Sequence, residues 1–84
     1  MKKTYTVTNR LGFHVMPSKR LATAAGNFAC DITLEFKGAQ ANPRKMIEIL
    51  KLGIKCSDEV TLITEGADSE QAQAVLGELL SQEH

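Results

Sequence analysis

Hydrophobic and polar residues alternate in three stretches of this chain. The stretches cover residues 4–8, 32–36 and 59–65, and their inward apolar positions are Tyr5 and Val7, then Ile32, Leu34 and Phe36, then Val60 and Leu62. A period of two is typical of a strand that buries one face. Lys37-Gly38 then predicts a turn into a further short strand near Gln40. The pattern therefore predicts four strands, two of which form a small hairpin.

Three other stretches carry apolar or small residues at helical spacing, and they predict helices that begin just after His14, at Pro43 and after the Gly66-Ala67-Asp68 break. Their apolar positions are Leu21, Ala24, Ala25 and Phe28 in the first, Ile47, Leu50 and Ile54 in the second, widened by Met46 and Ile49, and Ala72, Val75, Leu76, Leu79 and Leu80 in the third.

The helix ends also carry recognisable residues. Gly26-Asn27 predicts a left-handed C-terminus for the first helix, and Pro17 suits its first turn because a missing N–H costs nothing there. Asp68, followed three residues later by Gln71, resembles a capping box at the start of the last helix.

The predicted order is strand, helix, strand, strand, helix, strand, helix. Three amphipathic helices need one face of one sheet to bury their apolar stripes, which predicts an α+β two-layer sandwich. With 84 residues and short connections throughout, we expect a single domain over residues 1–84, without repeats or linkers.

The charge and composition of the chain narrow the range of possible functions. Ten basic and ten acidic residues give a formal net charge of zero, which removes the simplest electrostatic argument for a nucleic-acid or membrane-surface partner. No apolar run is long enough to span a bilayer, and the N-terminus lacks the apolar block of a signal peptide. We therefore expect a cytoplasmic protein with no membrane insertion.

The cysteines and histidines argue against a metal site. Cys30 and Cys56 form no Cys-x-x-Cys pair, and we expect both to be reduced, partly buried thiols. The two histidines are His14 and His84, and no cluster has the ligand spacing of a zinc site. We expect neither a metal nor another cofactor.

His14 is the residue best placed for chemistry. It follows the loop Asn9-Arg10-Leu11-Gly12 and precedes a helix, so its ring can lie beside the free N–H groups of the first helical turn. Those donors and the helix dipole can hold phosphoryl oxygens, and a neutral imidazole is a good nucleophile. A lone histidine is more commonly a cap or a packing residue, and local spacing does not exclude that alternative.

The run Thr8-Asn9-Arg10-Leu11-Gly12-Phe13-His14, followed by Pro17, resembles the active-site loop of the histidine-containing phosphocarrier (HPr) family of the phosphoenolpyruvate-dependent sugar phosphotransferase system. Leu52-Gly53, Asp58-Glu59-Val60-Thr61-Leu62 and the Glu65-Gly66-Ala67-Asp68 turn before a leucine-rich helix are similar to the family in order and spacing. The resemblance extends over essentially the whole chain.

This resemblance implies a four-stranded antiparallel sheet with three helices on one face, and a phosphoryl group on Nδ1 of His14. It also implies two kinds of partner. Enzyme I would supply the phosphoryl group from phosphoenolpyruvate, and the A domain of a sugar permease or a regulatory phosphoacceptor protein would receive it. The protein would then be a phosphoryl carrier with a phosphohistidine intermediate and not a complete enzyme.

Met16 is the main departure from the family, which usually has an arginine two residues after the histidine. A thioether can neither pair with phosphoryl oxygens nor neutralise their charge. We expect the backbone amides of Val15 and Met16 to bind the phosphoryl group, with the Ser18 hydroxyl adding a contact if its rotamer points back. Lys19, Arg20 and Arg44 are more simply interpreted as solvated charges.

The second predicted helix carries a further departure and the expected docking surface. Many family members have a regulatory serine at its start, where this chain has Lys45, so we expect no such regulation. By resemblance, partners would dock on exposed apolar residues around His14 and this helix, and these are Met16, Met46, Ile47 and Leu50. Leu50 could equally be ordinary core.

Two other functions remain open. One is a non-catalytic or regulatory HPr-like binding module, whose transfer is weakened because Met16 replaces the usual arginine. The other, more remote, is an unrelated small ligand-binding domain of the same class. The resemblance also implies that Cys30 and Cys56 lie at opposite ends of neighbouring strands, too far apart for a disulfide.

Overall fold

The computed structural model describes residues 1–10 and 12–81. Leu11, expected in the loop before His14, and the second histidine, His84, lie outside the described residues. The described residues form the strands β1 (Lys2–Thr6), β2 (Asp31–Phe36), β3 (Ala39–Ala41) and β4 (Glu59–Glu65). They form the helices α1 (Val15–Ala25), α2 (Met46–Leu52) and α3 (Ser69–Ser81), in the predicted order.

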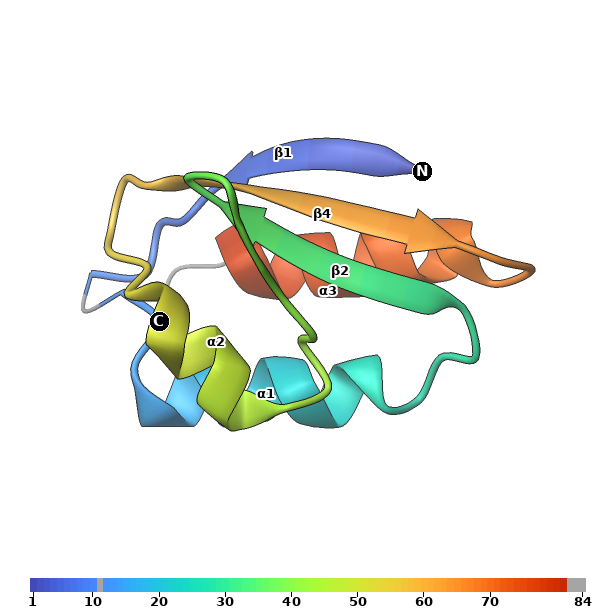
Figure 1. The fold of residues 1–84 in the computed structure, drawn as a ribbon, viewed down its shortest axis with the longest axis horizontal. Helices are drawn as coiled ribbons and strands as arrows, with labels where there is room; N and C mark the ends of the chain where they lie inside the picture. The colour runs from blue at the N-terminus through green and yellow to red at the C-terminus, as the bar shows by residue number, and fades with distance from the viewer. Residues whose placement is uncertain (11, 82–84) are drawn as a thin grey trace.

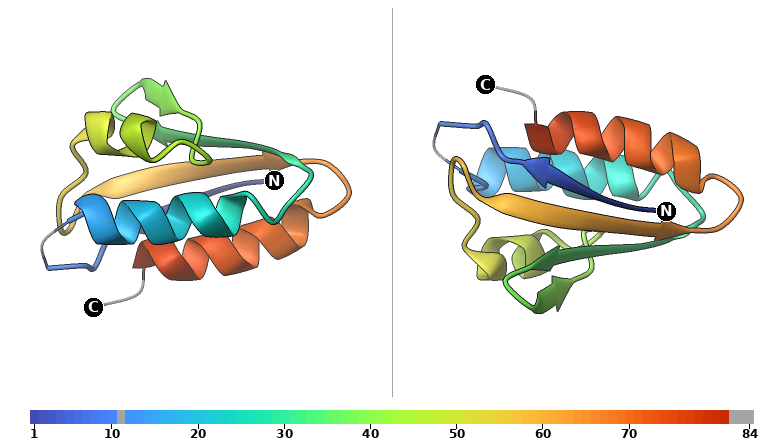
Figure 2. Two further views of the ribbon diagram at one scale, coloured as in Figure 1. Left: turned by 90° about the horizontal axis from the view of Figure 1, so that it is seen from below. Right: turned by 90° about the horizontal axis from the view of Figure 1, so that it is seen from above.

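The four strands form one antiparallel sheet in the order β1-β4-β2-β3. β4 pairs with β1 over residues 59–63 and with β2 over residues 61–65. The three helices lie on the same side of this sheet (Figure 1), and α1 and α3 run side by side beneath it (Figure 2). The predicted α+β open-faced sandwich is confirmed.

The core lies between the sheet and the helices because alternate residues of β2 and β4 turn toward α1 and α3. Both strands show the expected alternation of buried and more exposed side chains. The buried apolar residues are Val7, Phe13, Leu21, Ala25, Cys30, Ile32, Leu34, Phe36, Ala41, Ile49, Ile54, Val60, Leu62, Ala72, Leu76 and Leu80. Val75, predicted to lie on the apolar stripe of α3, is instead 44% exposed.

β1 begins and ends two residues earlier than the alternation over residues 4–8 predicts. Val7 is nevertheless fully buried, as expected, and its N–H donates to the Asp58 carbonyl at 2.8 Å. Ser57, in the connection between α2 and β4, has a φ of +76°, and its N–H donates to the Val7 carbonyl at 2.7 Å. The prediction that Val7 points into the core is thus correct, while the predicted ends of the strand were wrong.

The second helix is shorter at both ends than predicted. Residues 43–45 form a turn instead of a helix, because the Asn42 side-chain oxygen accepts the Arg44 N–H at 3.0 Å and its carbonyl accepts the Lys45 N–H at 3.0 Å. The helix ends at left-handed Gly53, so Ile54 is buried in the following connection.

The faces of α2 also differ from the prediction. Ile49, which the sequence treated as a surplus apolar residue, is fully buried in the core. Ile47, which was assigned to the main stripe, is 57% exposed. The helix begins at Met46 and contacts α1 and β3. These contacts determine which of its side chains are buried.

Two expected helix ends form differently. Gly26 ends α1 in the right-handed region, with φ of −65°, and not in the left-handed conformation. The Asp68 carboxylate accepts the N–H groups of Ala29 at 2.8 Å and Cys30 at 2.9 Å instead of capping α3. The predicted capping box with Gln71 is therefore wrong, and Asp68 joins the α3 start to the α1–β2 connection.

The two cysteines are free, as predicted, and lie at opposite ends of the β2–β4 pair. Cys30 is buried, and this burial, followed by its hydrogen bond to Asp68, raises the pKa of its thiol. Cys56 is exposed, so the expectation of partial burial was wrong for it. Within residues 1–10 and 12–81, none of the helices has the length and apolarity that crossing a bilayer requires.

Candidate functional site

The histidine loop, which we define as residues 7–10 and 12–14, lies against the connection between α2 and β4. The Phe13 N–H donates to the Ile54 carbonyl at 3.0 Å, and the Ser57 N–H donates to the Val7 carbonyl at 2.7 Å. The Phe13 ring is buried in the core. Both ends of the loop are therefore attached to one neighbouring connection, which the sequence analysis did not identify.

Gly12 allows the close contact between these two segments. Its φ is +72°, and a Cβ there would lie 2.6 Å from the Ile54 carbonyl oxygen and 2.9 Å from the Lys55 Cα. The neighbouring atoms are backbone and cannot move aside cheaply. A residue other than glycine would be strained both by its backbone angle and by crowding, so Gly12 was the sequence signal for this contact.

His14 lies at the N-cap position of α1, with φ of −82° and ψ of −164°. Its carbonyl accepts the first helical hydrogen bond, from the Ser18 N–H at 3.1 Å. Its side chain is exposed and makes no capping hydrogen bond to the helix. The imidazole therefore stands at the helix N-terminus, open to solvent, as the sequence predicts.

The first turn of α1 presents two backbone donors beside this ring. Within the described part of the chain, the N–H groups of Val15 and Met16 have no hydrogen-bond partner, and Pro17 has no N–H to offer. The first turn also contains no acidic side chain. Free donors and the positive end of the helix dipole make this end of α1 suited to an anion.

Ser18 requires a correction to its expected role. Its hydroxyl donates to the Phe13 carbonyl at 3.2 Å, and the side chain is fully buried. A hydroxyl held there points into the loop and not toward an anion beside the exposed His14 ring. The sequence alone does not determine this rotamer.

The predicted docking residues occupy α1 and α2, which pack against each other. Met16 is 52% exposed and its neighbour Val15 is 53% exposed, while Ile47 projects from the exposed side of α2. Met46 and Leu50 are only half-buried. The structure thus leaves apolar side chains accessible on both α1 and α2.

Lys19 and Arg20 lie further along α1, where they line a hollow of about 470 Å³ together with Met16 and Leu79 of α3. Arg20 is engaged in an interaction of its own. Met16 therefore borders a groove that carries two cationic residues, although it cannot itself supply a cation.

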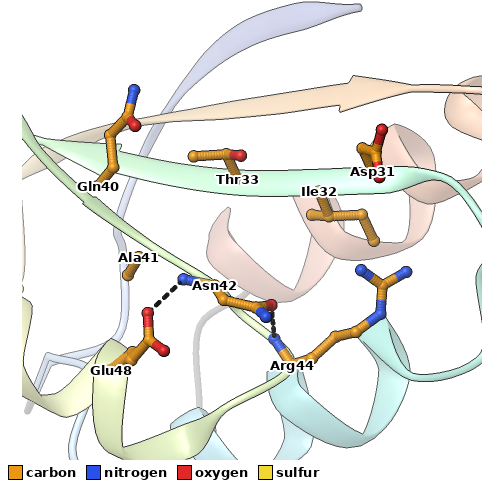
Figure 3. Close-up of a pocket in the computed structure, with 8 residues that line it drawn as sticks. All are labelled: Asp31, Ile32, Thr33, Gln40, Ala41, Asn42, Arg44 and Glu48. Carbon is orange, nitrogen blue, oxygen red and sulfur yellow. Dashed lines mark hydrogen bonds between the residues drawn. The ribbon is translucent and has the colours of Figure 1, made fainter.

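Arg44 does not line this groove, and its side chain binds the α1–β2 connection instead. Its Nη2 atom donates to the carbonyls of Phe28 at 2.6 Å and Cys30 at 2.8 Å. Figure 3 shows its side chain beside a hollow of about 490 Å³, which opens where β2 and the segment after β3 diverge. His14 does not line this hollow, and Arg44 serves the fold there.

Some of the other polar groups around the hollow in Figure 3 also make contacts within the protein. Glu48 accepts the Asn42 N–H at 2.9 Å, and its other oxygen lies 3.9 Å from the Lys45 ammonium group. Lys45 is thus an exposed residue directly before α2. Among the described residues, no group of three or more His, Cys, Asp or Glu side chains could hold a metal ion.

The chain is thus a small open-faced α+β sandwich with an exposed histidine at a helix N-terminus. The family model for the PTS HPr component phosphorylation site matches residues 1–82. The chain belongs to this HPr family.

Solved structures agree with this assignment. The chain is 27% identical to the phosphocarrier protein HPr from Bacillus anthracis, with a TM-score of 0.92 and coverage of 96% of both chains. It is 26% identical to the histidine-containing phosphocarrier protein of Mycoplasma, with a TM-score of 0.89 and coverage of 98% of this chain and 99% of that one.

One similar sequence comes from a much longer protein. The chain is 35% identical over 80 residues to the phosphoryl donor subunit DhaM of the PEP-dependent dihydroxyacetone kinase from Pantoea ananatis. The match covers 95% of this chain but only 17% of that protein. The chain therefore spans about a sixth of the length of this relative.

Proposed function

We propose that this protein is a phosphocarrier that accepts a phosphoryl group on His14 from phosphorylated Enzyme I and passes it to an acceptor protein in a phosphoenolpyruvate-dependent relay. The single observation that carries the proposal is the exposed His14 ring at the start of α1, next to the N–H groups of Val15 and Met16, which are unpartnered in the part of the chain that the structure describes. Membership of the HPr family supports it.

The transfer needs a nucleophile and a place for negative charge. The Nδ1 lone pair of neutral His14 would attack phosphorus as the N–P bond to the donor histidine breaks, and the released electron pair would return to the donor ring. The Val15 and Met16 amides would hold the equatorial oxygens, assisted by the helix dipole. The onward step reverses these roles with the acceptor.

Met16 would make this site depend on the backbone more than its relatives do. Loss of one charge-assisted hydrogen bond to a phosphoryl oxygen costs about 1.5–3 kcal/mol, which corresponds to roughly one to two powers of ten in rate. Transfer would therefore be slower than with an arginine in this position but would still occur.

Incubation with Enzyme I and phosphoenolpyruvate, followed by mass spectrometry, tests the function directly. The expected product carries one acid-labile phosphoryl group that maps to His14, and His14→Ala should abolish it without loss of the fold, because the exposed ring makes no capping bond. Lys19→Ala, on the exposed side of α1, is the control that should still be labelled. Normal labelling of His14→Ala would reject the proposal.

A second candidate function is favoured by Met16 itself: an HPr-like module that binds a partner and regulates it, with transfer reduced or lost. The comparison of Met16→Arg with the wild type separates the two functions. A gain of about tenfold to a hundredfold is expected for a carrier that lacks one cationic partner, whereas transfer that is measurable only in Met16→Arg would favour the binding module. A change of less than threefold would indicate a site adapted to work through its backbone.

The acceptor is proposed from chemistry and from the relatives. We propose either the A domain of a sugar permease or a regulatory phosphoacceptor protein. The similarity to DhaM, a phosphoryl donor subunit of a PEP-dependent dihydroxyacetone kinase, supports a role in donating the phosphoryl group to another protein. No further cofactor enters the proposed relay, and the protein would act in the cytoplasm as a carrier and not as a complete enzyme.

For docking, we propose the surface formed by Met16, Met46, Ile47 and Leu50. Exposed, flexible methionines suit a surface that must accept both a donor and an acceptor. Ile47→Ser is the sharpest test because this side chain is exposed and outside the core. It should raise the KM of Enzyme I for the carrier while leaving the unfolding free energy nearly unchanged, whereas an unchanged KM would remove Ile47 from the surface.

A further inference from the structure

The Phe13 carbonyl belongs to the peptide unit that also contains the His14 N–H. This carbonyl accepts the Ser18 hydroxyl at 3.2 Å, and both Phe13 and Ser18 are buried. Buried carbonyls without a donor are costly, so a bond at this position has structural consequences. The bond joins the backbone directly before His14 to the first turn of α1.

The sequence explains why a hydroxyl is needed there. The helical ladder begins with the His14 carbonyl, which accepts the Ser18 N–H. One position earlier, the Phe13 carbonyl would correspond to the N–H of residue 17, but Pro17 has none. The hydroxyl of the next residue, Ser18, supplies the donor that proline cannot.

The other side of Phe13 is held as well. Its N–H donates to the Ile54 carbonyl at 3.0 Å, so the polar groups on both sides of this residue are fixed by segments outside the loop. Since the peptide unit is planar, a carbonyl directed at buried Ser18 directs the His14 N–H the opposite way. A flip of this unit would turn a partly negative oxygen away from Ser18, toward the exposed side where His14 lies.

We propose that Ser18 is a positioning residue for His14: its hydroxyl fixes the Phe13–His14 peptide plane and thereby keeps the carbonyl oxygen away from the phosphoryl group. The inference rests on the proposed function for its kinetic part. It replaces direct phosphoryl binding by Ser18 with an action through the backbone. The amides of Val15 and Met16 then remain the groups that touch the phosphoryl oxygens.

The test compares Ser18→Ala, which removes the hydroxyl, with Ser18→Thr, which keeps it. Ser81→Ala is a matched control, because the Ser81 hydroxyl also donates to a backbone carbonyl, that of Gly77 at 2.8 Å. Ser18→Ala should lower the rate constant for phosphorylation by Enzyme I roughly tenfold to a hundredfold, the range that a misplaced reacting group produces. The KM should not change, because the docking surface is untouched.

A spectroscopic measurement accompanies the kinetics. The backbone amide signal of His14 in an ¹⁵N-correlated NMR spectrum should shift in Ser18→Ala, return toward the wild-type position in Ser18→Thr, and stay unchanged in Ser81→Ala. A wild-type rate and an unshifted His14 amide in folded Ser18→Ala would overturn the inference. So would a KM increase that accounts for the whole kinetic loss, because this would indicate impaired docking.

The two proposals fail in different ways. If the wild-type protein is not phosphorylated on His14, the proposed function is wrong, and the NMR comparison still decides whether Ser18 sets the peptide plane. If the wild type is phosphorylated but Ser18→Ala reacts equally fast with an unshifted amide, only the positioning inference is wrong. Should Ser18→Thr not fold, the shift and the rate of Ser18→Ala against Ser81→Ala still give this decision.

Discussion

The two ends of α1 treat their backbone polar groups in opposite ways. At the N-terminal end, the N–H groups of Val15 and Met16 have no partner among the described residues. Beyond the C-terminal end, the α1–β2 connection is bound by two charged side chains: Arg44 donates to the carbonyls of Phe28 and Cys30, and Asp68 accepts the N–H of Cys30.

The comparison distinguishes backbone groups that stabilise the fold from backbone groups that are accessible to a ligand. Charged side chains satisfy the backbone where the chain must be fixed, and at that end an added anion or cation would find few open groups. At the other end, no acidic side chain occupies the first turn, so an anion would meet donors that are already aligned. The following three predictions probe this contrast, beginning with the largest expected effect.

Gly12→Ala should have the largest effect, because it disturbs the histidine loop at the N-terminal end of α1. A left-handed φ costs alanine about 1 kcal/mol, and crowding against the Ile54 carbonyl should add about 1–3 kcal/mol. The displaced loop should also lower the phosphorylation rate of His14. Urea unfolding and the Enzyme I assay measure the two effects.

Gly38→Ala is the matched control, since Gly38 also has a positive φ, +81°, but a Cβ there would meet no atom within 4 Å. It should lose only the backbone part, about 1 kcal/mol, and keep its transfer rate. Equal losses of stability in the two variants would mean that the contact with Ile54 does not constrain the loop.

Arg44→Ala should destabilise the connection beyond the C-terminal end of α1 without affecting the N-terminal end of that helix. The Phe28 and Cys30 carbonyls lose a charged donor, at an expected cost of about 1.5–3 kcal/mol in unfolding free energy. Lys45→Ala is the control, because its 3.9 Å pair with Glu48 is exposed, and its stability should change by less than about 0.5 kcal/mol. A tenfold drop in the phosphorylation rate of folded Arg44→Ala would contradict the separation of the two ends.

Asp68→Asn should change the stability of the protein least, and the change should be visible mainly in how the stability depends on pH. The backbone N–H of Ala29, and then the hydrogen bond with Cys30, hold the pKa of the Asp68 carboxyl below its usual value. A lowered folded-state pKa stabilises the protein above the unfolded value, about 4, and this contribution disappears as the pH falls through the folded-state value.

Thermal unfolding at several pH values measures this contribution. The Tm of the wild type should exceed that of Asp68→Asn at pH 7, and the gap should narrow below about pH 4. Glu70→Gln, an exposed carboxylate in the first turn of α3, is the control and should show no comparable narrowing. A gap that stays constant down to pH 2 would exclude ionised Asp68 as its cause.

The fold could be predicted well wherever a periodic pattern had a single buried face. β4 begins and ends where the alternation over residues 59–65 places it, and α1 begins directly after His14. α2 was less predictable, because Pro43 can start a helix or occupy a turn. The Asn42 side chain, which accepts the Arg44 N–H, decides for the turn.

The candidate site divides in the same way. The positions of His14, Val15 and Met16 at a helix N-terminus follow from local sequence. The partners of Arg44 and Asp68 do not, since they are backbone atoms 14 to 39 residues away, which only the tertiary structure brings near. Ser18 lies close in sequence to its acceptor, but a rotamer decides its partner, and periodicity says nothing about rotamers.

The N–H groups of Val15 and Met16, which find no partner within residues 1–10 and 12–81, have a consequence for how this protein tolerates mutation. A donor that belongs to the main chain persists through every side-chain replacement except proline, which alone lacks it. Positions 15 and 16 can therefore carry side chains as different as arginine and methionine while both main-chain donors are retained. Proline at either position would remove one of the two donors in a single step.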